Sequence, residues 1–151
     1  MPMASTPSMA AWVRRTVSKV SQGASACSKN ALSLPVRDAR TAVQRGYDCL
    51  KVKVGIDPEL DVARLAAVRQ AVGRDIRLRI DANQAWNAKQ AVRILNQMQE
   101  KGLDIEFVEQ PVPAADLEGM QYVTRHADVP VLADESEVGG QAVLGRQCFG
   151  T

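Results

Sequence analysis

Hydrophobic and polar residues follow two different periods along the middle of the chain. Between residues 38 and 136, short apolar stretches alternate with longer segments in which apolar residues recur every three or four positions. The short stretches are typical of β-strands, and the longer segments are typical of amphipathic helices. Strands that alternate with helices of about 10–15 residues indicate βαβ units and a parallel sheet.

Turn and capping residues mark where these elements begin and end. Asp57 followed by Pro58 is a typical helix start, and Gly73 is a typical helix end. Asn87 can cap a further helix, which Gly102 would end. We therefore expect strands at 49–54, 76–80, 105–108 and 129–133, and helices at 38–45, 58–72, 88–101 and 115–126.

The two ends of the chain differ from this domain of residues 38–136. Residues 1–37 are rich in Ser and Ala and contain five Lys or Arg but no acidic residue. We expect a poorly ordered extension that is not part of the domain, although a basic, Ser-rich, acid-free leader is also typical of a mitochondrial transit peptide. Residues 137–151 show no clear periodicity, which predicts an irregular tail.

The length of the chain limits the architecture of the domain. A complete (β/α)8 barrel usually takes roughly 250 residues, whereas this chain has 151. We therefore expect an α/β fold that is a partial (β/α) barrel of about four to five parallel strands with flanking helices. Such a barrel would stay open or be completed by self-association, since an exposed parallel sheet edge favours a homo-oligomer.

Composition and charge exclude several classes of partner. The net charge is only +2 and aromatic residues make up 4% of the chain, so nucleic-acid binding is not supported. No apolar run approaches the roughly 18–20 residues of a membrane span. The three cysteines are far apart and form no C-x-x-C pair, which indicates free thiols in a reducing compartment. These features predict a cytoplasmic protein.

A polar residue stands at or just after the end of each predicted strand. These residues are Lys53, Asp81, Glu109 and Asp134, at intervals of 28, 28 and 25 residues. Because each interval is one βα unit, the four side chains should lie at the carboxyl ends of adjacent strands, which carry the active site in barrels. One acid there is typical of a helix cap or an ion pair, but three in register favour a cation. Carboxylate oxygens without His or Cys indicate Mg²⁺ or Mn²⁺.

Lys51 and Lys53 are two positions apart on a predicted strand, so their side chains should share one face. Val52 and Val54 would then face the helices, and both lysines would enter the barrel interior. An exposed edge strand is the alternative for a Lys-x-Lys pair, but the register of the acids favours the interior. Two neighbouring ammonium groups beside a metal lower each other's pKa, which would provide a general base.

Four motifs resemble, in order and spacing, the enolase superfamily and within it the muconate-lactonizing subgroup. The resemblance covers about 100 of the 151 residues. Within the subgroup it is greatest to dipeptide epimerases of the L-Ala-D/L-Glu type, followed by muconate and o-succinylbenzoate enzymes. The motifs are Lys51-Val-Lys53, Asp81-Ala-Asn83, Glu109-Gln-Pro111 and Asp134-Glu-Ser136.

The resemblance implies a metal site and a substrate class. Asp81, Glu109 and Asp134 would bind Mg²⁺, and the substrate would be a small carboxylate or a dipeptide. The metal would stabilise the enediolate that forms when a proton α to a carboxylate leaves.

The resemblance also implies roles for the residues around that metal. Lys53 would remove the proton, and Lys51 would hold the substrate carboxylate and tune Lys53. Asn83 would line the site, and Glu135 would support a neighbouring ligand. Glu106 is not expected at the site: it should face away because it lies an odd number of positions from Glu109 on the same strand.

His126 should lie at the end of a helix, where a cation is favourable.

The sequence also departs from the family, which has a second lysine on the sixth strand and an N-terminal capping domain. No lysine follows Lys101, and residues 1–37 are too short for that domain. We therefore expect a truncated enzyme with impaired activity. The alternative is a non-catalytic, metal-binding or structural half-barrel that self-associates.

Overall fold

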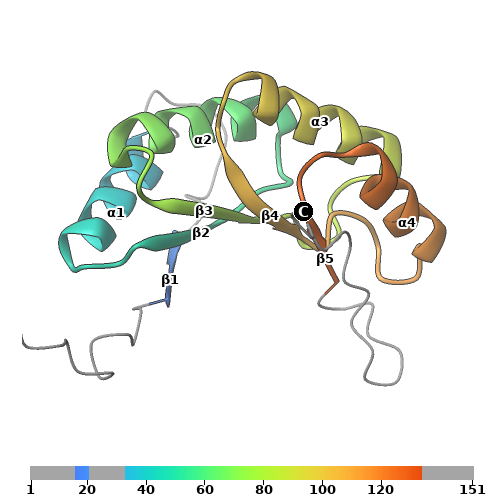
Figure 1. Cartoon of the computed structure of the whole chain (residues 1–151), viewed down its shortest axis with the longest axis horizontal. Coiled ribbons are helices and arrows are strands. Elements are labelled where there is room, and N and C mark those ends of the chain that lie inside the picture. The colour runs from blue at the N-terminus through green and yellow to red at the C-terminus, as the bar shows by residue number, and fades with distance from the viewer. Residues whose placement is uncertain (1–15, 21–32, 134–151) are drawn as a thin grey trace, which may run out of the picture.

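The computed structural model describes residues 16–20 and 33–133, which form one parallel sheet and four helices (Figure 1). The strands lie side by side in chain order, and every neighbouring pair is parallel. The predicted α/β fold with four to five parallel strands is therefore confirmed. The elements are β1 (Thr16–Val20), α1 (Ser33–Gln44), β2 (Cys49–Lys53), α2 (Pro58–Val72), β3 (Arg77–Asp81), α3 (Ala88–Glu100), β4 (Ile105–Glu109), α4 (Leu117–His126) and β5 (Val131–Leu132).

All four helices cover the same face of the sheet, and the core lies between them and the strands (Figure 1). From β2 and β3, the alternate residues Leu50, Val52, Leu78 and Ile80 are buried in this core. Each of these apolar side chains contributes roughly 1.5–3 kcal/mol when fully buried. The prediction that Val52 and Val54 face the helices is confirmed, because both belong to the core cluster.

The predicted capping residues set the bounds of α2 and α3. The Asp57 side chain accepts a hydrogen bond from the Leu60 amide, and Gly73 follows the helix at a φ of 82°. The Asn87 side chain accepts from the Gln90 amide, while the Gln90 side chain accepts from the Asn87 amide. These reciprocal bonds satisfy amides that the helix itself leaves without partners, which is why the sequence located these helix starts correctly.

The amino-terminal part of the chain differs from the prediction. The first helix begins at Ser33 instead of Asp38, with Pro35 in its first turn, where a missing amide proton costs nothing. Upstream of it, β1 pairs in parallel with β2. The expected helix start at residue 38 is therefore wrong, while the domain boundary at that residue stays a prediction. The predicted tail at 137–151 lies outside the described residues.

A buried arginine joins the loops that lead into β3 and β4. The Arg69 guanidinium donates to the carbonyls of Gly73 (2.7 Å) and Ile76 (2.5 Å) before β3. It also donates to Leu103 (2.9 Å) and Asp104 (3.0 Å) before β4. Burial lowers the pKa of Arg69 from its ordinary value, but an arginine stays charged at any physiological pH.

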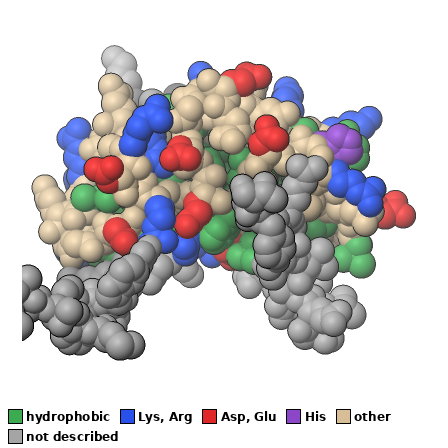
Figure 2. Space-filling view, viewed as in Figure 1, with side chains coloured by type: hydrophobic (Ala, Val, Ile, Leu, Met, Phe, Trp, Pro, Cys, Tyr) green, Lys and Arg blue, Asp and Glu red, His purple; other side chains and the backbone are tan. Residues whose placement is uncertain are grey.

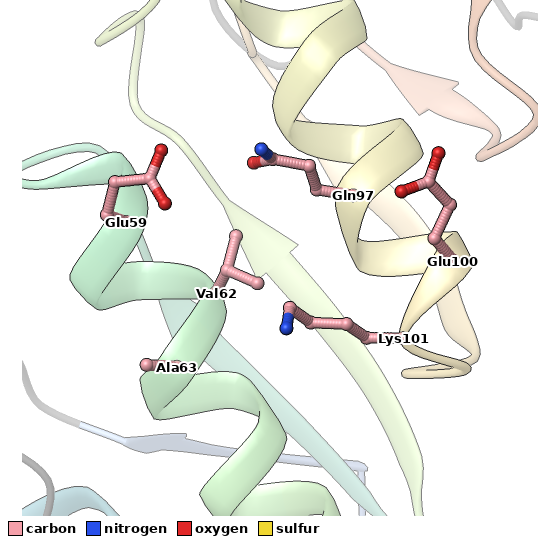
Figure 3. A pocket seen from close by; sticks show the side chains of 6 residues that line it. All are labelled: Glu59, Val62, Ala63, Gln97, Glu100 and Lys101. Atoms are coloured by element: carbon pink, nitrogen blue, oxygen red, sulfur yellow. The ribbon is translucent and has the colours of Figure 1, made fainter.

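Charges of both signs are mixed on the face that Figure 2 shows, and the described helices are too short or too polar to span a membrane. Figure 2 shows acidic and basic side chains interspersed over the visible face. None of the helices described between residues 33 and 133 is long and apolar enough to cross a bilayer. A cavity of about 530 Å³ opens between α2 and α3 (Figure 3), and it contains none of the predicted site residues. Its lining consists of Glu59, Val62, Ala63, Gln97, Glu100 and Lys101.

Candidate active site

The carboxyl ends of β2, β3 and β4 lie in register at one edge of the sheet. Lys53 pairs with Asp81 across β2 and β3, and Asp81 pairs with Glu109 across β3 and β4. Asp81 and Glu109 are each 8% exposed, so both carboxylates are largely removed from water. The predicted alignment of these three strand ends is confirmed.

One ammonium group lies between the two carboxylates. The Lys51 Nζ contacts Glu109 Oε1 and Oε2, each at 2.6 Å, and Asp81 Oδ2 at 3.4 Å. Lys51 therefore lies on the same face as the acids and opposite Val52, as predicted. The two acids repel each other when both are charged, and the lysine offsets that repulsion. The two carboxylates can thus hold a cation together.

The two acids determine the electrostatics of Lys51. Burial of its ammonium favours the neutral form, but the hydrogen bond and the charge of Glu109, together with Asp81, outweigh burial and raise the pKa of Lys51. A lowered pKa was expected from the neighbouring Lys53. That expectation assumed a bound metal beside both lysines and stays a prediction, whereas here the two carboxylates contact the Lys51 ammonium directly.

Asn83 lies at the same edge, two residues after Asp81. It is exposed, and its backbone amide donates to Asp81 Oδ1 at 3.1 Å. Its φ of 47° is in the left-handed region, which asparagine tolerates better than most residues. The amide therefore orients the Asp81 carboxylate, while a contact of the Asn83 side chain with a substrate stays a prediction.

The loops that follow β3 and β4 are joined by backbone hydrogen bonds, which we call the loop seam. The amides of Ala82, Gln84 and Trp86 donate to the carbonyls of Glu109 (3.0 Å), Gln110 (2.8 Å) and Pro111 (3.1 Å). Gln84 Oε1 also accepts from the Ala114 amide at 2.8 Å. The seam links the segment after Asp81 to the segment after Glu109, so it fixes how the two strand ends sit together.

Sequence reasoning missed the two glutamines of this seam. Gln84 and Gln110 have φ values of 66° and 41°, which are unusual for residues with a long side chain. Neither residue is charged, and both follow the end of a strand, where the alternation of polar and apolar residues no longer applies. Their only signal is that Gln110 directly follows Glu109 inside one of the four motifs.

The loop after β2 packs against the loop after β3. Gly55 has a φ of 115°, and a Cβ placed on it would lie 2.3 Å from the Cβ of Ala85. Its amide donates to Asp61 Oδ2 at 2.6 Å, and Asp61 is fully buried with Arg64 as its ion-pair partner at 2.9 Å. Burial raises the pKa of Asp61 above its ordinary value. This anchor could not be predicted from the sequence, because Asp61 resembles any other acid in a first helical turn.

Two of the predicted residues, Asp134 and Glu135, lie outside the described residues. β5 ends at Leu132, which pairs with Glu109. Within residues 16–20 and 33–133, no three His, Cys, Asp or Glu side chains gather closely enough to hold a metal ion. Asp81 and Glu109 are brought together, and a third ligand from Asp134 stays a prediction.

The expected orientation of Glu106 is wrong. Its carboxylate pairs with Arg79 (2.5 Å) and Arg77 (3.5 Å), which alternate with the buried residues of β3 and therefore share the face of Asp81. The cause is a bulge: Ile105 pairs with Leu78 and Phe107 with Arg79, so Glu106 is an extra residue in the ladder. An extra residue resets the alternation of side chains, which a count along the sequence cannot detect.

Other residues agree with their predictions. His126 is the last residue of α4, where its ring contacts the Tyr122 carbonyl and stacks on the Tyr122 ring. Cys49 is a free, buried thiol, and burial raises its pKa.

The fold and the acidic strand ends define an α/β protein of the (β/α)-barrel type. The chain belongs to the enolase C-terminal domain-like family, whose model matches residues 35–143. This match agrees with the family that the four motifs indicate.

Individual relatives carry the comparison further. Over 100 residues the chain is 52% identical to the L-Ala-D/L-Glu epimerase of Clostridium acetobutylicum, which covers 66% of this chain and 28% of that protein. A substrate-liganded structure of the L-Ala-D/L-Glu epimerase from Bacillus subtilis matches with a TM-score of 0.71 and 41% identity, over 79% of this chain and 32% of that one.

A dipeptide epimerase from Enterococcus faecalis, complexed with Mg and the dipeptide L-Leu-L-Tyr, matches with a TM-score of 0.66 and 47% identity. The match covers 69% of this chain and 29% of that one. The chain therefore spans less than a third of the length of each of these three relatives.

Proposed function

We propose that this chain forms the magnesium-binding, lysine-bearing part of an enzyme that removes a proton α to a carboxylate, of the dipeptide epimerase kind. The observation that carries the proposal is the convergence of Asp81 and Glu109 on one cationic atom, Lys51 Nζ. This convergence lies at the carboxyl ends of parallel strands, where barrel enzymes bind their substrates.

The residues at this edge fit a hard divalent cation. Two largely buried carboxylates already hold one positive charge between them, and their oxygens are the ligands that Mg²⁺ prefers. Asp81, Glu109 and Asp134 would hold the metal, and Mn²⁺ would suit the same oxygens. No histidine or thiol among the described residues joins this cluster, which disfavours zinc.

The lysines of β2 supply the remaining chemistry. A bound Mg²⁺ would stabilise the negative charge that develops on the substrate carboxylate as the α-proton leaves. Lys53 pairs in register with Asp81, and its side chain would accept that proton at Nζ. Lys51 would keep the substrate carboxylate and the two acids in place, while Asn83 and Glu135 would complete the surroundings.

The substrate class follows from the same edge and from the relatives. A metal and two lysines suit a small carboxylate, and the relatives that resemble this chain act on dipeptides by name. A cycloisomerase-like reaction would use the same first step, since it also begins with loss of a proton α to a carboxylate. The epimerase reaction has the greater support, because three relatives that are 52%, 49% and 46% identical to this chain are epimerases.

A calorimetric titration with Mg²⁺ tests the proposal on the full chain. We expect saturable binding of one ion per chain that is lost in Asp81→Asn, Glu109→Gln and Asp134→Asn. Glu100→Gln is the matched control, because Glu100 is an exposed acid at the end of α3. Absence of binding in a folded wild-type chain would overturn the metal site.

A second function is favoured by one observation. Lys51 contacts both acids, so it offsets part of their repulsion and can hold the strand ends together as a structural ion cluster without a metal. The chain could then be a non-catalytic half-barrel that self-associates. Deuterium exchange at the α-carbon of L-Ala-L-Glu separates the two functions. Exchange that needs Mg²⁺ and disappears in Lys53→Met supports the enzyme, whereas no exchange by a Mg²⁺-bound, oligomeric chain supports the structural role.

A further inference from the structure

We infer that Gln110 is a positioning residue that sets the spacing of the metal-binding acids and thereby the preference of the site for Mg²⁺ over larger cations. This inference rests on the proposed function, and it assigns a role to a residue that is itself neither a proposed ligand nor the proposed base. It is argued from the hydrogen bonds of the loop seam.

The burial of Gln110 is the first observation. Its side chain is fully buried, and Nε2 donates to the Val112 carbonyl at 2.9 Å. A buried amide must be hydrogen-bonded to be tolerated, and this one bonds within the turn that directly follows Glu109. The side chain therefore determines the path of the chain as it leaves the ligand strand.

The backbone of Gln110 joins three strands. Its amide donates to the Leu132 carbonyl of β5 at 2.9 Å, and its carbonyl accepts from the Gln84 amide at 2.8 Å. The three strands concerned are those that lead to Asp81, Glu109 and Asp134. Gln110 is thus a residue that bonds through its own backbone both to the loop after β3 and to β5.

The conformation of Gln110 supports a role for its side chain. At a φ of 41° the backbone lies in the left-handed region, which a glycine would occupy without strain. A glycine would keep the two backbone bonds but could not donate to Val112. The hydrogen bond from the Gln110 side-chain amide to Val112 therefore holds the strained backbone and fixes the turn after Glu109.

Mg²⁺ and Ca²⁺ require different coordination geometries, so the spacing of the acids should affect the ratio of the two affinities. Mg²⁺ demands near-ideal octahedral geometry with short bonds, whereas Ca²⁺ accepts longer and irregular coordination. Loss of the turn would move Glu109 relative to Asp81, so it should weaken Mg²⁺ more than Ca²⁺. A purely structural role would lower the stability of the fold without changing the ratio of the two affinities.

The test compares Gln110→Met with the matched control Gln99→Met in the full chain. Methionine keeps the volume but removes the donor, and Gln99 is an exposed residue of α3. We expect Gln110→Met to raise the Kd for Mg²⁺ about tenfold, the usual effect of losing a residue that orients a ligand. The Kd for Ca²⁺ should rise by no more than about threefold, and the control should change neither constant.

Gln84→Ala is the second variant, in case Gln110→Met does not fold. Gln84 is exposed, so its side chain can be removed with little risk to the fold, and the change deletes only the bond to the Ala114 amide. A smaller loss of Mg²⁺ preference in the same direction supports the inference. An unchanged ratio of the two Kd values in the folded variants overturns it. A folded wild-type chain without Mg²⁺ binding would instead overturn the proposed function itself.

Discussion

The two ends of the sheet are held together in different ways. At the amino ends of β3 and β4, a single buried side chain, Arg69, donates to four carbonyls. At the carboxyl ends, the loop seam joins backbone to backbone, and three of the four described non-glycine residues with positive φ lie there.

This difference separates stability from function within one small sheet. A side-chain clamp can hold the amino ends without constraining any candidate ligand. A backbone seam with left-handed residues keeps the carboxyl ends in one geometry at the cost of local strain, as is common beside functional sites. In barrel proteins the amino ends contribute to stability and the carboxyl ends carry the chemistry.

The largest expected effect comes from removing the clamp. Arg69→Met should lower the free energy of unfolding by about 4 kcal/mol, because several buried carbonyls lose their donor at once. Chemical denaturation measures the change, and Arg93→Met on the exposed face of α3 is the control. The folded variant should keep the Mg²⁺ affinity of the wild type. A parallel loss of affinity would show that the two ends are not independent.

A smaller effect is expected from adding one methyl group at the carboxyl end. Gly55→Ala should cost about 3 kcal/mol, because it combines a left-handed backbone with a collision against Ala85. Gly73→Ala is the matched control, since its φ of 82° and ψ of −178° also strain any other residue but nothing lies within 4 Å of the new atom. We expect about 2 kcal/mol there. Equal costs in thermal unfolding would mean that the two loops are less tightly packed than the structure indicates.

The smallest expected effect is the dependence of stability on pH through Asp61. Burial raises the pKa of Asp61 above its ordinary value of 3.8, so the folded chain binds a proton there more readily than the unfolded chain. The contribution of Asp61 to stability is therefore most favourable below pH 3.8 and is lost as the pH rises through the folded pKa. Asp61→Asn cannot titrate.

The difference in free energy of unfolding between wild type and Asp61→Asn should consequently shift in favour of the wild type as the pH falls from 7 to 4. Titration of the other acids is common to both proteins and largely cancels. A difference that stays flat with pH would contradict the direction of the shift. Arg69 cannot provide such a dependence, so the acid sensitivity should belong to the carboxyl end.

The sequence was most informative where local chemistry decides the structure. Asp57 and Asn87 cap helices through bonds to amides three residues away, and strand ends at Lys53, Asp81 and Glu109 could be located from a regular βα repeat. The capping bonds span three residues, and the repeat spans one βα unit. Together these two patterns predict the register of the candidate site.

The features that could not be predicted depend on contacts between residues that are far apart in the sequence. The bulge at Glu106 needs knowledge of the partner strand, and the role of Arg69 needs the positions of carbonyls 34 and 35 residues away. The raised pKa of Lys51 follows from the direct contact with Glu109, 58 residues along the chain. The seam through Gln84 and Gln110 could not be predicted, because most of its bonds join backbone groups, which every residue carries.

The bulge in β4 has a consequence for recognising related sequences. Ile105 and Val108 both face the helices although three positions separate them, so the strand absorbs one additional residue without turning Glu109 to the other face. The interval of 28 residues between Asp81 and Glu109 is therefore not a geometric requirement. A relative that lacks the extra residue would place the same two acids side by side at an interval of about 27. A search that demands fixed spacing would miss such a protein, whereas one that allows a single gap at this point would find it.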